Sequence, residues 1–186
     1  MNIHRPLALR AAALLLAVMP LSLHAEPPST KPAPTAPAKK KNWTPPSHKM
    51  LAQVLSDRTM AAHPELLSVT FHGVPPGMDK VYTMFAGSFP ERIGNPDDPD
   101  DIDVITKGIT IVDPRWYRTT DHPKKFLVML PLRDKNKENI GLIVYAFKLD
   151  TNPGKGEREF IAEALDLRDA LSEQIPSYEA LFAAPQ

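Results

Sequence analysis

The chain carries few residue patterns that could perform covalent chemistry. It has no Gly-x-Ser-x-Gly elbow, no His-Glu-x-x-His metal motif, no glycine-rich phosphate loop and no cysteine. The absence of cysteine excludes disulfides, thiolate metal sites, a cysteine nucleophile and the acylated cysteine of a lipoprotein. Ser88 has no base nearby in the sequence, so it is interpreted as an ordinary strand residue. We therefore expect neither an enzyme nor a cofactor.

Histidine and aspartate offer a metal interpretation that their spacing does not favour. The histidines after residue 25 lie on separate predicted elements with no i, i+4 pair: His48, His63, His72 and His122. His63 and His72 could meet only if a helix end and a strand end adjoin, so surface or capping roles are preferred and no metal site is expected. Five aspartates lie within Asn95–Gly108, but they lack the glycine and glutamate of an EF-hand loop. Helix capping explains them better.

The sequence offers more candidate residues for ligand binding than for catalysis. Arg92 follows a predicted strand and precedes the aspartate-rich segment, where its guanidinium could pair bidentately with a carboxylate ligand. A structural ion pair with Asp100 or Asp101 explains the position equally well, and both interpretations stay open. Tyr82 and Tyr145 lie on predicted strands and could point hydroxyls into one cavity. Core packing with a satisfied hydroxyl is the favoured alternative for both.

The elements that would position these residues centre on an apolar hairpin. Phe126–Leu132 and Ile140–Phe147 are short and rich in β-branched and aromatic residues, which predicts two strands. The seven polar residues between them predict a long hairpin loop. Because both faces of the pair are apolar, we place it in the middle of a sheet.

Further elements are predicted on both sides of the hairpin. The pattern indicates a helix from Ser47 to about Ala62, strands at Leu66–Phe71, Lys80–Phe89 and Ile109–Val112, a short helix within Asn95–Gly108 capped by Asp98, and a helix from Glu157 to about Gln174. We expect Tyr178, Leu181 and Phe182 to pin the tail to the core. Five strands with helices grouped around one sheet predict an α+β domain.

The N-terminal region has the features of a targeting segment. Met1–Ala25 combines a basic start, a short apolar core and small residues near Ala25, which predicts a signal peptide cleaved near Ala25 and a periplasmic or secreted protein. An uncleaved anchor is the alternative.

The next segment separates this region from the domain. Residues 26–46 hold seven of the 21 prolines and predict a disordered Pro/Lys-rich linker before a domain at 47–186. Residues 49–186 carry 16 basic and 21 acidic side chains, a net charge of −5. Nucleic acid is not expected as a partner of such an acidic domain.

Two stretches carry a resemblance to a known family. The segments AGSFPERIGNPDDPDDIDVITKG and FLVMLPLRDKNKENIGLIVYAF resemble extracytoplasmic PAS-like Cache (PDC) sensor domains, over about residues 47–182. The resemblance implies a five-stranded antiparallel PAS/Cache-like sheet with a long N-terminal helix, a short capping helix and a C-terminal helix. It also implies a small-molecule pocket on the face opposite the long helix. Its geometry would place Trp116 and Tyr117 over the sheet, where they could wall a ligand or cover the core, and we favour the second role.

Two functions follow as expectations. The first is a stand-alone sensing module that binds a small ligand, a carboxylate or an amino acid, and reports it to a membrane-bound signalling partner. No kinase, methyl-accepting or cyclase domain follows in this sequence, so the readout is expected on another protein. The second is a secreted structural or interaction protein of the same fold without a ligand.

Overall fold

The predicted apolar hairpin lies at the middle of a sheet in the computed structural model, which describes residues 39–120 and 122–185. Strand β4 (Lys125–Arg133) pairs antiparallel with β5 (Asn139–Lys148), and the strand order is β2-β1-β5-β4-β3. The central strand is therefore β5, with β4 beside it. The predicted position of the hairpin is confirmed.

The remaining elements complete an α+β arrangement. The other strands are β1 (Leu66–Gly73), β2 (Thr83–Gly87) and β3 (Ile111–Asp113); the helices are α1 (Leu51–Ala62), α2 (Pro99–Lys107) and α3 (Glu157–Ser172); the 3-10 turns are η1 (Pro90–Arg92), η2 (Arg115–Tyr117) and η3 (Glu179–Phe182). All neighbouring strands pair antiparallel. The predicted fold class is confirmed, and it is consistent with a PAS-like α+β fold.

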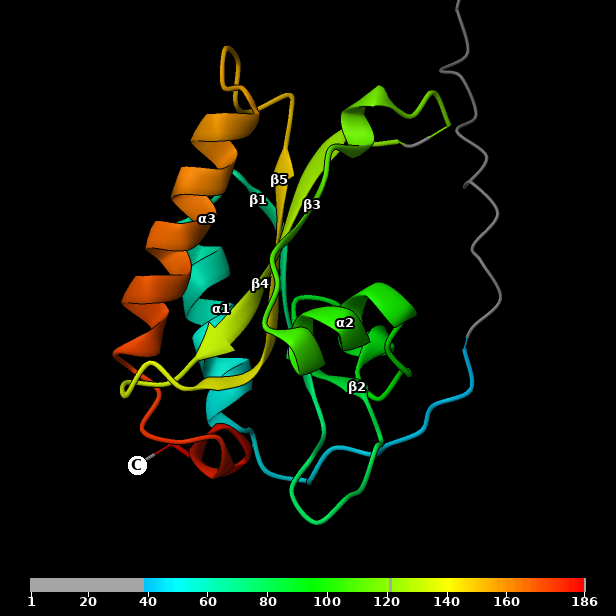
Figure 1. Ribbon diagram of the computed structural model, residues 1–186, viewed down its shortest axis with the longest axis vertical. Helices are drawn as coiled ribbons and strands as arrows, with labels where there is room; N and C mark the ends of the chain where they lie inside the picture. The colour runs from blue at the N-terminus through cyan, green and yellow to red at the C-terminus, as the bar shows by residue number, and fades with distance from the viewer. Residues whose placement is uncertain (1–38, 121, 186) are drawn as a thin grey trace, which may run out of the picture. The chain divides into compact units, whose positions relative to one another are not determined.

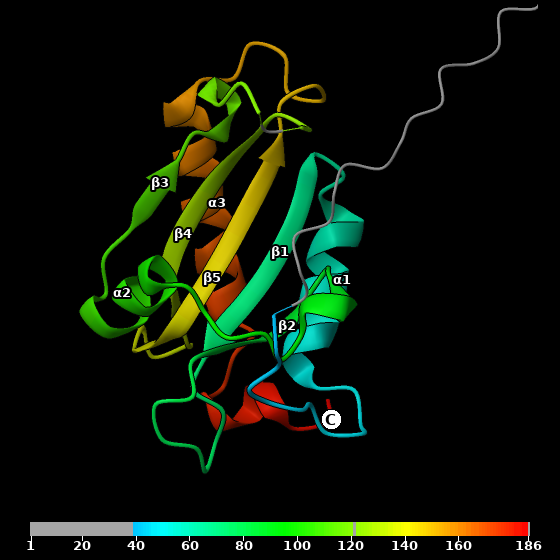
Figure 2. The same ribbon diagram turned by 90° about the vertical axis from the view of Figure 1, so that its right-hand side faces the viewer.

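The helices divide unequally between the two faces of the sheet. Helices α1 and α3 lie side by side on one face and α2 lies on the other, as the edge-on view shows (Figure 1). Turned by 90°, the sheet shows β5 between β1 and β4, with α3 and α1 behind it (Figure 2). We call these the α1/α3 face and the α2 face.

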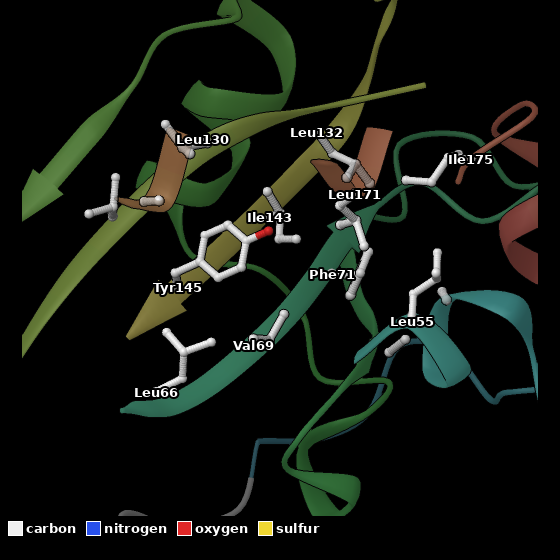
Figure 3. Close-up of a cluster of buried hydrophobic side chains, with 14 of the residues drawn as sticks. Leu55, Leu66, Val69, Phe71, Leu130, Leu132, Ile143, Tyr145, Leu171 and Ile175 are labelled. Carbon is white, nitrogen blue, oxygen red and sulfur yellow. The ribbon is translucent and has the colours of Figure 1, made fainter. Parts of the chain in front are cut away.

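The α1/α3 face holds the larger core. Leu66, Val69 and Phe71 of β1 meet Ile143 and Tyr145 of β5 there, and all five are 0% exposed. Leu55 of α1 and Leu171 of α3 close over them (Figure 3). A smaller cluster on the α2 face joins Val104 of α2 to Met129, Leu142 and Val144. Apolar burial on both faces explains why the central strands are apolar throughout.

Helix α2 has the ends that its sequence predicts. Asp98 is the N-cap and its backbone N–H donates to the Asp101 carboxylate, with 3.0 Å between Nα and Oδ2. Pro99 occupies the first helical position. Gly108 ends the helix with a left-handed φ of 65°, which a residue without Cβ adopts at little cost.

Several predicted boundaries differ from those in the structure. Helix α1 begins at Leu51 rather than Ser47, because the Leu51 N–H donates to the carbonyl of Ala183 in the C-terminal tail. Strand β2 is shorter than Lys80–Phe89, since Lys80 has a φ of 55° that leaves the extended conformation. Strand β3 begins two residues later than predicted.

The described end of the predicted linker packs on the domain. Lys39 Nζ lies 2.6 Å from Asp98 Oδ1, and the Asn42 N–H donates to the Gly94 carbonyl. The Trp43 ring meets the Phe182 ring edge-on at 6.1 Å. Residues 39–43 are therefore part of the domain rather than a spacer.

The predicted signal peptide and the first part of the predicted linker lie outside the described residues. Within the residues that are described, no helix combines the length and the apolar character that crossing a bilayer requires.

Candidate functional site

The two faces of β1 differ in chemistry. Val69 and Phe71 point to the apolar α1/α3 core, and strand alternation places Ser68, Thr70 and His72 on the α2 face. All three polar residues are buried at 6% exposure. Buried polar side chains need partners, and His72 and Thr70 hydrogen-bond to each other on this face.

His72 is the centre of a buried polar group. Its Nδ1 lies 2.7 Å from Asp97 Oδ1, and its Nε2 lies 2.8 Å from the Thr70 hydroxyl oxygen. Asp101 joins them, since one ligand-capable atom from each of His72, Asp97 and Asp101 lies within 4.8 Å of the other two. We call these three residues the His72 cluster.

One atom of the cluster has no partner. The Asp97 side chain is 0% exposed, and within the described part of the chain its Oδ2 meets no hydrogen-bond donor. A buried carboxylate oxygen without a donor is unfavourable.

Three separate elements bring the cluster together. The segment before α2 runs along the outer edge of β2, where the Asp97 N–H donates to the Tyr82 carbonyl and Thr83 pairs with Pro96. This pairing places Asp97 beside the end of β1, which carries His72. Asp101 comes from the first turn of α2, which the cap at Asp98 fixes.

The electrostatics of Asp101 reflect the crowding of carboxylates. Burial raises the pKa of the Asp101 carboxyl above its usual range, and the charges of Asp97 and Asp100 act in the same direction. The His72 ring and the Asp98 N–H oppose this shift. An added positive charge would relieve the repulsion between these carboxylates.

An open hollow of about 360 Å³ lies where β1 ends and β5 begins, between α2 and the C-terminal tail. Its lining combines apolar side chains with one amide and one phenol: Gly73, Val74, Ile105, Asn139, Ile140, Gly141 and Tyr178. Gly73 directly follows His72, and Ile105 lies about one helical turn after Asp101 on α2.

A second hollow lies on the opposite side of the sheet. It has a volume of about 190 Å³ and runs between α1 and α3, with Arg58 and His63 on one wall and Ala170 and Gln174 on the other. His63 Nδ1 lies 2.9 Å from Glu65 Oε1, far along β1 from His72. The two histidines therefore do not meet, and His72 has neither a surface nor a capping role.

The two aromatic residues of the η2 loop, Trp116 and Tyr117, lie in different environments. Trp116 packs on Phe126 and Phe160, with ring centroids 4.7 and 5.7 Å away, so it covers the α1/α3 core as favoured from the sequence. Tyr117 meets Trp116 edge-on but is 72% exposed.

The other three predicted site residues lie apart. Arg92 is exposed in η1, with its guanidinium carbon 5.4 Å from the Phe89 ring centroid, and it pairs with no carboxylate of the described residues. Tyr82 is half-buried just before β2, and Tyr145 is fully buried among the side chains of the α1/α3 face. None of the five predicted site residues lines either cavity described above: Tyr82, Arg92, Trp116, Tyr117 and Tyr145.

The His72 cluster was not identified from the sequence, although part of its signal is readable there. In LLSVTFH, polar side chains recur at every second position of a strand otherwise made of apolar residues. This alternation indicates a polar buried face, but the partners of His72 come from positions 25 and 29 residues later.

No protein-family model matches the chain, and no curated protein matches it. Among solved structures, the sensor domain of DcuS from E. coli overlaps with 53% of this chain and 67% of its own, with 20% identity and a TM-score of 0.37. The C-terminal domain of the E. coli transcriptional regulator KdgR overlaps with 69% of this chain and 96% of its own, with 11% identity and a TM-score of 0.38. These scores describe partial backbone overlap, so the fold assignment rests on the sheet order and layers above.

Proposed function

We propose that the protein is a periplasmic or secreted binding module of a sensing system. It takes up a small ligand on the α2 face, and a separate membrane-bound protein reads the bound state. Because a fold alone does not specify function, the proposal depends on the site. The observation that carries it is the difference between the two faces, since the α2 face holds a buried polar group and an open hollow lined by Ile105 of α2 lies beside the end of β1.

The cavity limits the size of the ligand. Small-molecule sites commonly occupy about 300–1,000 Å³, so a cavity of about 360 Å³ suits a small metabolite. The lining is mostly apolar, with the Asn139 amide and the Tyr178 hydroxyl as polar groups. This combination is typical of a site where a few polar contacts orient an otherwise apolar pocket.

The charges favour a ligand with an amino group. Among the residues that line the cavity there is no lysine or arginine, and Gly73 of the lining directly follows His72, the partner of Asp97. An amine or an amino acid therefore suits this cavity better than a dicarboxylate. A carboxylate anchored on Arg92 would occupy a different place, on η1.

Export from the cytoplasm is supported by the first 25 residues. Their basic start and short apolar core are typical of a secretory signal. The mature protein is expected to begin near Glu26 and to be recovered in the periplasmic fraction. N-terminal sequencing of that fraction checks both points, and a cytosolic protein that retains Met1 would contradict them.

A ligand screen with two cavity-filling variants tests the site. Amines, amino acids and small carboxylates are added to the wild-type protein and to Val74→Trp, which fills the hollow at the end of β1. The control, Ala170→Trp, fills the groove between α1 and α3 instead. At a ligand concentration about 100 times Kd, binding contributes about 2.7 kcal/mol to stability and raises Tm by several degrees.

We expect the amino-bearing compounds to raise the Tm of the wild type and of Ala170→Trp but not of Val74→Trp. An equal shift in Val74→Trp would contradict the cavity assignment. The screen is repeated on Arg92→Ala. If the Tm shift is lost in this variant and kept in Val74→Trp, the ligand binds at η1 instead. No shift with any compound would favour a structural or interaction protein without a ligand.

A further inference from the structure

We propose that His72, Asp97 and Asp101 bind one divalent transition-metal ion of the Zn²⁺ class. The inference goes beyond the proposed function and does not depend on the organic ligand. It rests on the arrangement of these three side chains and on the unpartnered oxygen of Asp97.

The unpartnered oxygen is the first observation. The Asp97 side chain is 0% exposed and uses Oδ1 for His72, while Oδ2 meets no donor from the described residues. Two carboxylates and an imidazole form an electron-rich group, and no lysine or arginine of residues 39–120 and 122–185 forms an ion pair with Asp97 or Asp101. A cation is the partner that satisfies the free oxygen and the charge together.

The distances suit a small metal ion. Zn²⁺ binds imidazole nitrogen at about 2.0–2.1 Å and carboxylate oxygen at about 2.0–2.2 Å, so two ligands of a tetrahedral ion lie roughly 3.3 Å apart. The three ligand atoms lie within 4.8 Å of one another, and His72 Nδ1 and Asp97 Oδ1 are 2.7 Å apart. Side-chain movements on the order of 1 Å produce the coordination distances.

Thr70 supplies the outer support that a metal-binding histidine needs. If His72 Nδ1 binds the metal, its Nε2 carries the proton and donates to the Thr70 hydroxyl, 2.8 Å away. A hydrogen bond on the opposite ring nitrogen fixes the tautomer and the orientation of a ligating imidazole.

The ligand set selects the class of ion. Imidazole suits Zn²⁺, Ni²⁺ and Co²⁺, whereas Ca²⁺ and Mg²⁺ prefer six or more oxygen ligands. Three protein ligands leave a fourth tetrahedral position for water or another donor, as in open zinc sites. Asp101 is only partly buried, so the ion can enter from its side.

A metal titration with a matched pair of variants tests the proposal. The chelator-treated mature protein is titrated with Zn²⁺ by calorimetry and with Co²⁺ by visible absorption. Asp101→Asn removes a ligand and keeps an oxygen that can accept from the Asp98 N–H. Asp100→Asn makes the same charge change on an exposed neighbour outside the cluster.

We expect one Zn²⁺ per chain in the wild type and in Asp100→Asn, with Kd values within about twofold. Asp101→Asn should bind at least tenfold more weakly, since even outer-shell changes cost about 10–100-fold in metal affinity. Thr70→Val should weaken binding by that outer-shell factor. At a Co²⁺ concentration that saturates the wild type, the absorption should persist in Asp100→Asn and be weaker in Asp101→Asn.

Several results would overturn the proposal. Unchanged Zn²⁺ affinity in Asp101→Asn would mean that the ion binds elsewhere. If the wild type binds no Zn²⁺, the partner of the Asp97 oxygen is a water molecule or a proton shared with Asp101. Displacement by equimolar Ca²⁺ would contradict the class of ion. Repeating the organic-ligand screen in chelator separates the two proposals, because a ligand shift that persists without metal supports the proposed function alone.

Discussion

Tyr145 and Tyr178 place their hydroxyl groups in opposite environments. The Tyr145 side chain is 0% exposed and lies among leucine, isoleucine and valine side chains, as Figure 3 shows. Within the described residues its hydroxyl has no hydrogen-bond partner, whereas the Tyr178 hydroxyl donates to the Val74 carbonyl at 2.8 Å. Burial raises the pKa of both phenols above the usual range, so both stay neutral.

The pair predicts opposite effects of removing one oxygen. Tyr145→Phe should leave the free energy of unfolding unchanged or raise it, because it removes a buried polar atom without a partner. Tyr178→Phe should lower it by about 0.5–1.5 kcal/mol through the lost hydrogen bond. Urea denaturation measures both. Equal losses would mean that the Tyr145 hydroxyl has a partner, and loss of ligand binding in Tyr145→Phe would place the pocket on the α1/α3 face.

Helix α2 and helix α1 differ in how far local sequence determines them. Asp98, Pro99 and Gly108 carry all the signals that begin and end α2, so its bounds were predicted from the sequence. The start of α1 depends on a hydrogen bond from Leu51 to Ala183, a residue at the other end of the chain. Ser47 offered a plausible local cap, and the tertiary contact overrides it.

The hairpin contains a glycine that the pairing of strands requires. Gly141 of β5 has a φ of 155°, and a Cβ there would lie 2.6 Å from the His72 carbonyl oxygen of β1. Gly154 has a φ of 84° in an exposed turn, where a Cβ would meet no atom within 4 Å. Gly141→Val should therefore lower Tm far more than Gly154→Val, which bears only backbone strain of about 1–2 kcal/mol. Thermal denaturation checks the order, and equal midpoints would contradict the register of β1 and β5.

The N-terminal segment adds to stability through one aromatic contact. Trp43 is half-buried, packs on the α1/α3 core and approaches Gly94 closely with its carbonyl. Trp43→Ala should lower the free energy of unfolding by about 1–3 kcal/mol, below the range for a fully buried tryptophan. Lys40→Ala, an exposed change in the same segment, should have no effect. A Trp43→Ala variant that melts with the wild type would show that the segment does not pack in solution.

Across the whole molecule, the sequence predicted the layers better than the site. The apolar hairpin and the helical patterns are local, and they were enough to predict an α+β domain around one sheet. The cluster of His72, Asp97 and Asp101 needs the pairing of residues 94–97 with β2, which no local pattern contains. The alternation of Ser68, Thr70 and His72 was readable, but it has meaning only once α2 covers that face.

The two faces of the sheet differ in their apolar cores and in their buried polar groups. The α1/α3 face holds the main apolar core, which Trp116 covers from η2. The α2 face holds the buried polar group and the Asp97 oxygen that meets no donor among the described residues, and the hollow of about 360 Å³ lies at the end of the sheet beside α2. Changes on the first face are therefore expected to alter Tm, and changes on the second to alter binding.

Native mass spectrometry of the mature protein, purified without denaturant, tests the central claim most directly. The wild type and Ala170→Trp should carry the mass of one small organic molecule beyond the polypeptide, and Val74→Trp should lack it. Chelator treatment removes any metal ion and leaves this added mass in place. A mass equal to the polypeptide alone in the wild type, or the same added mass in Val74→Trp, would contradict a ligand site on the α2 face.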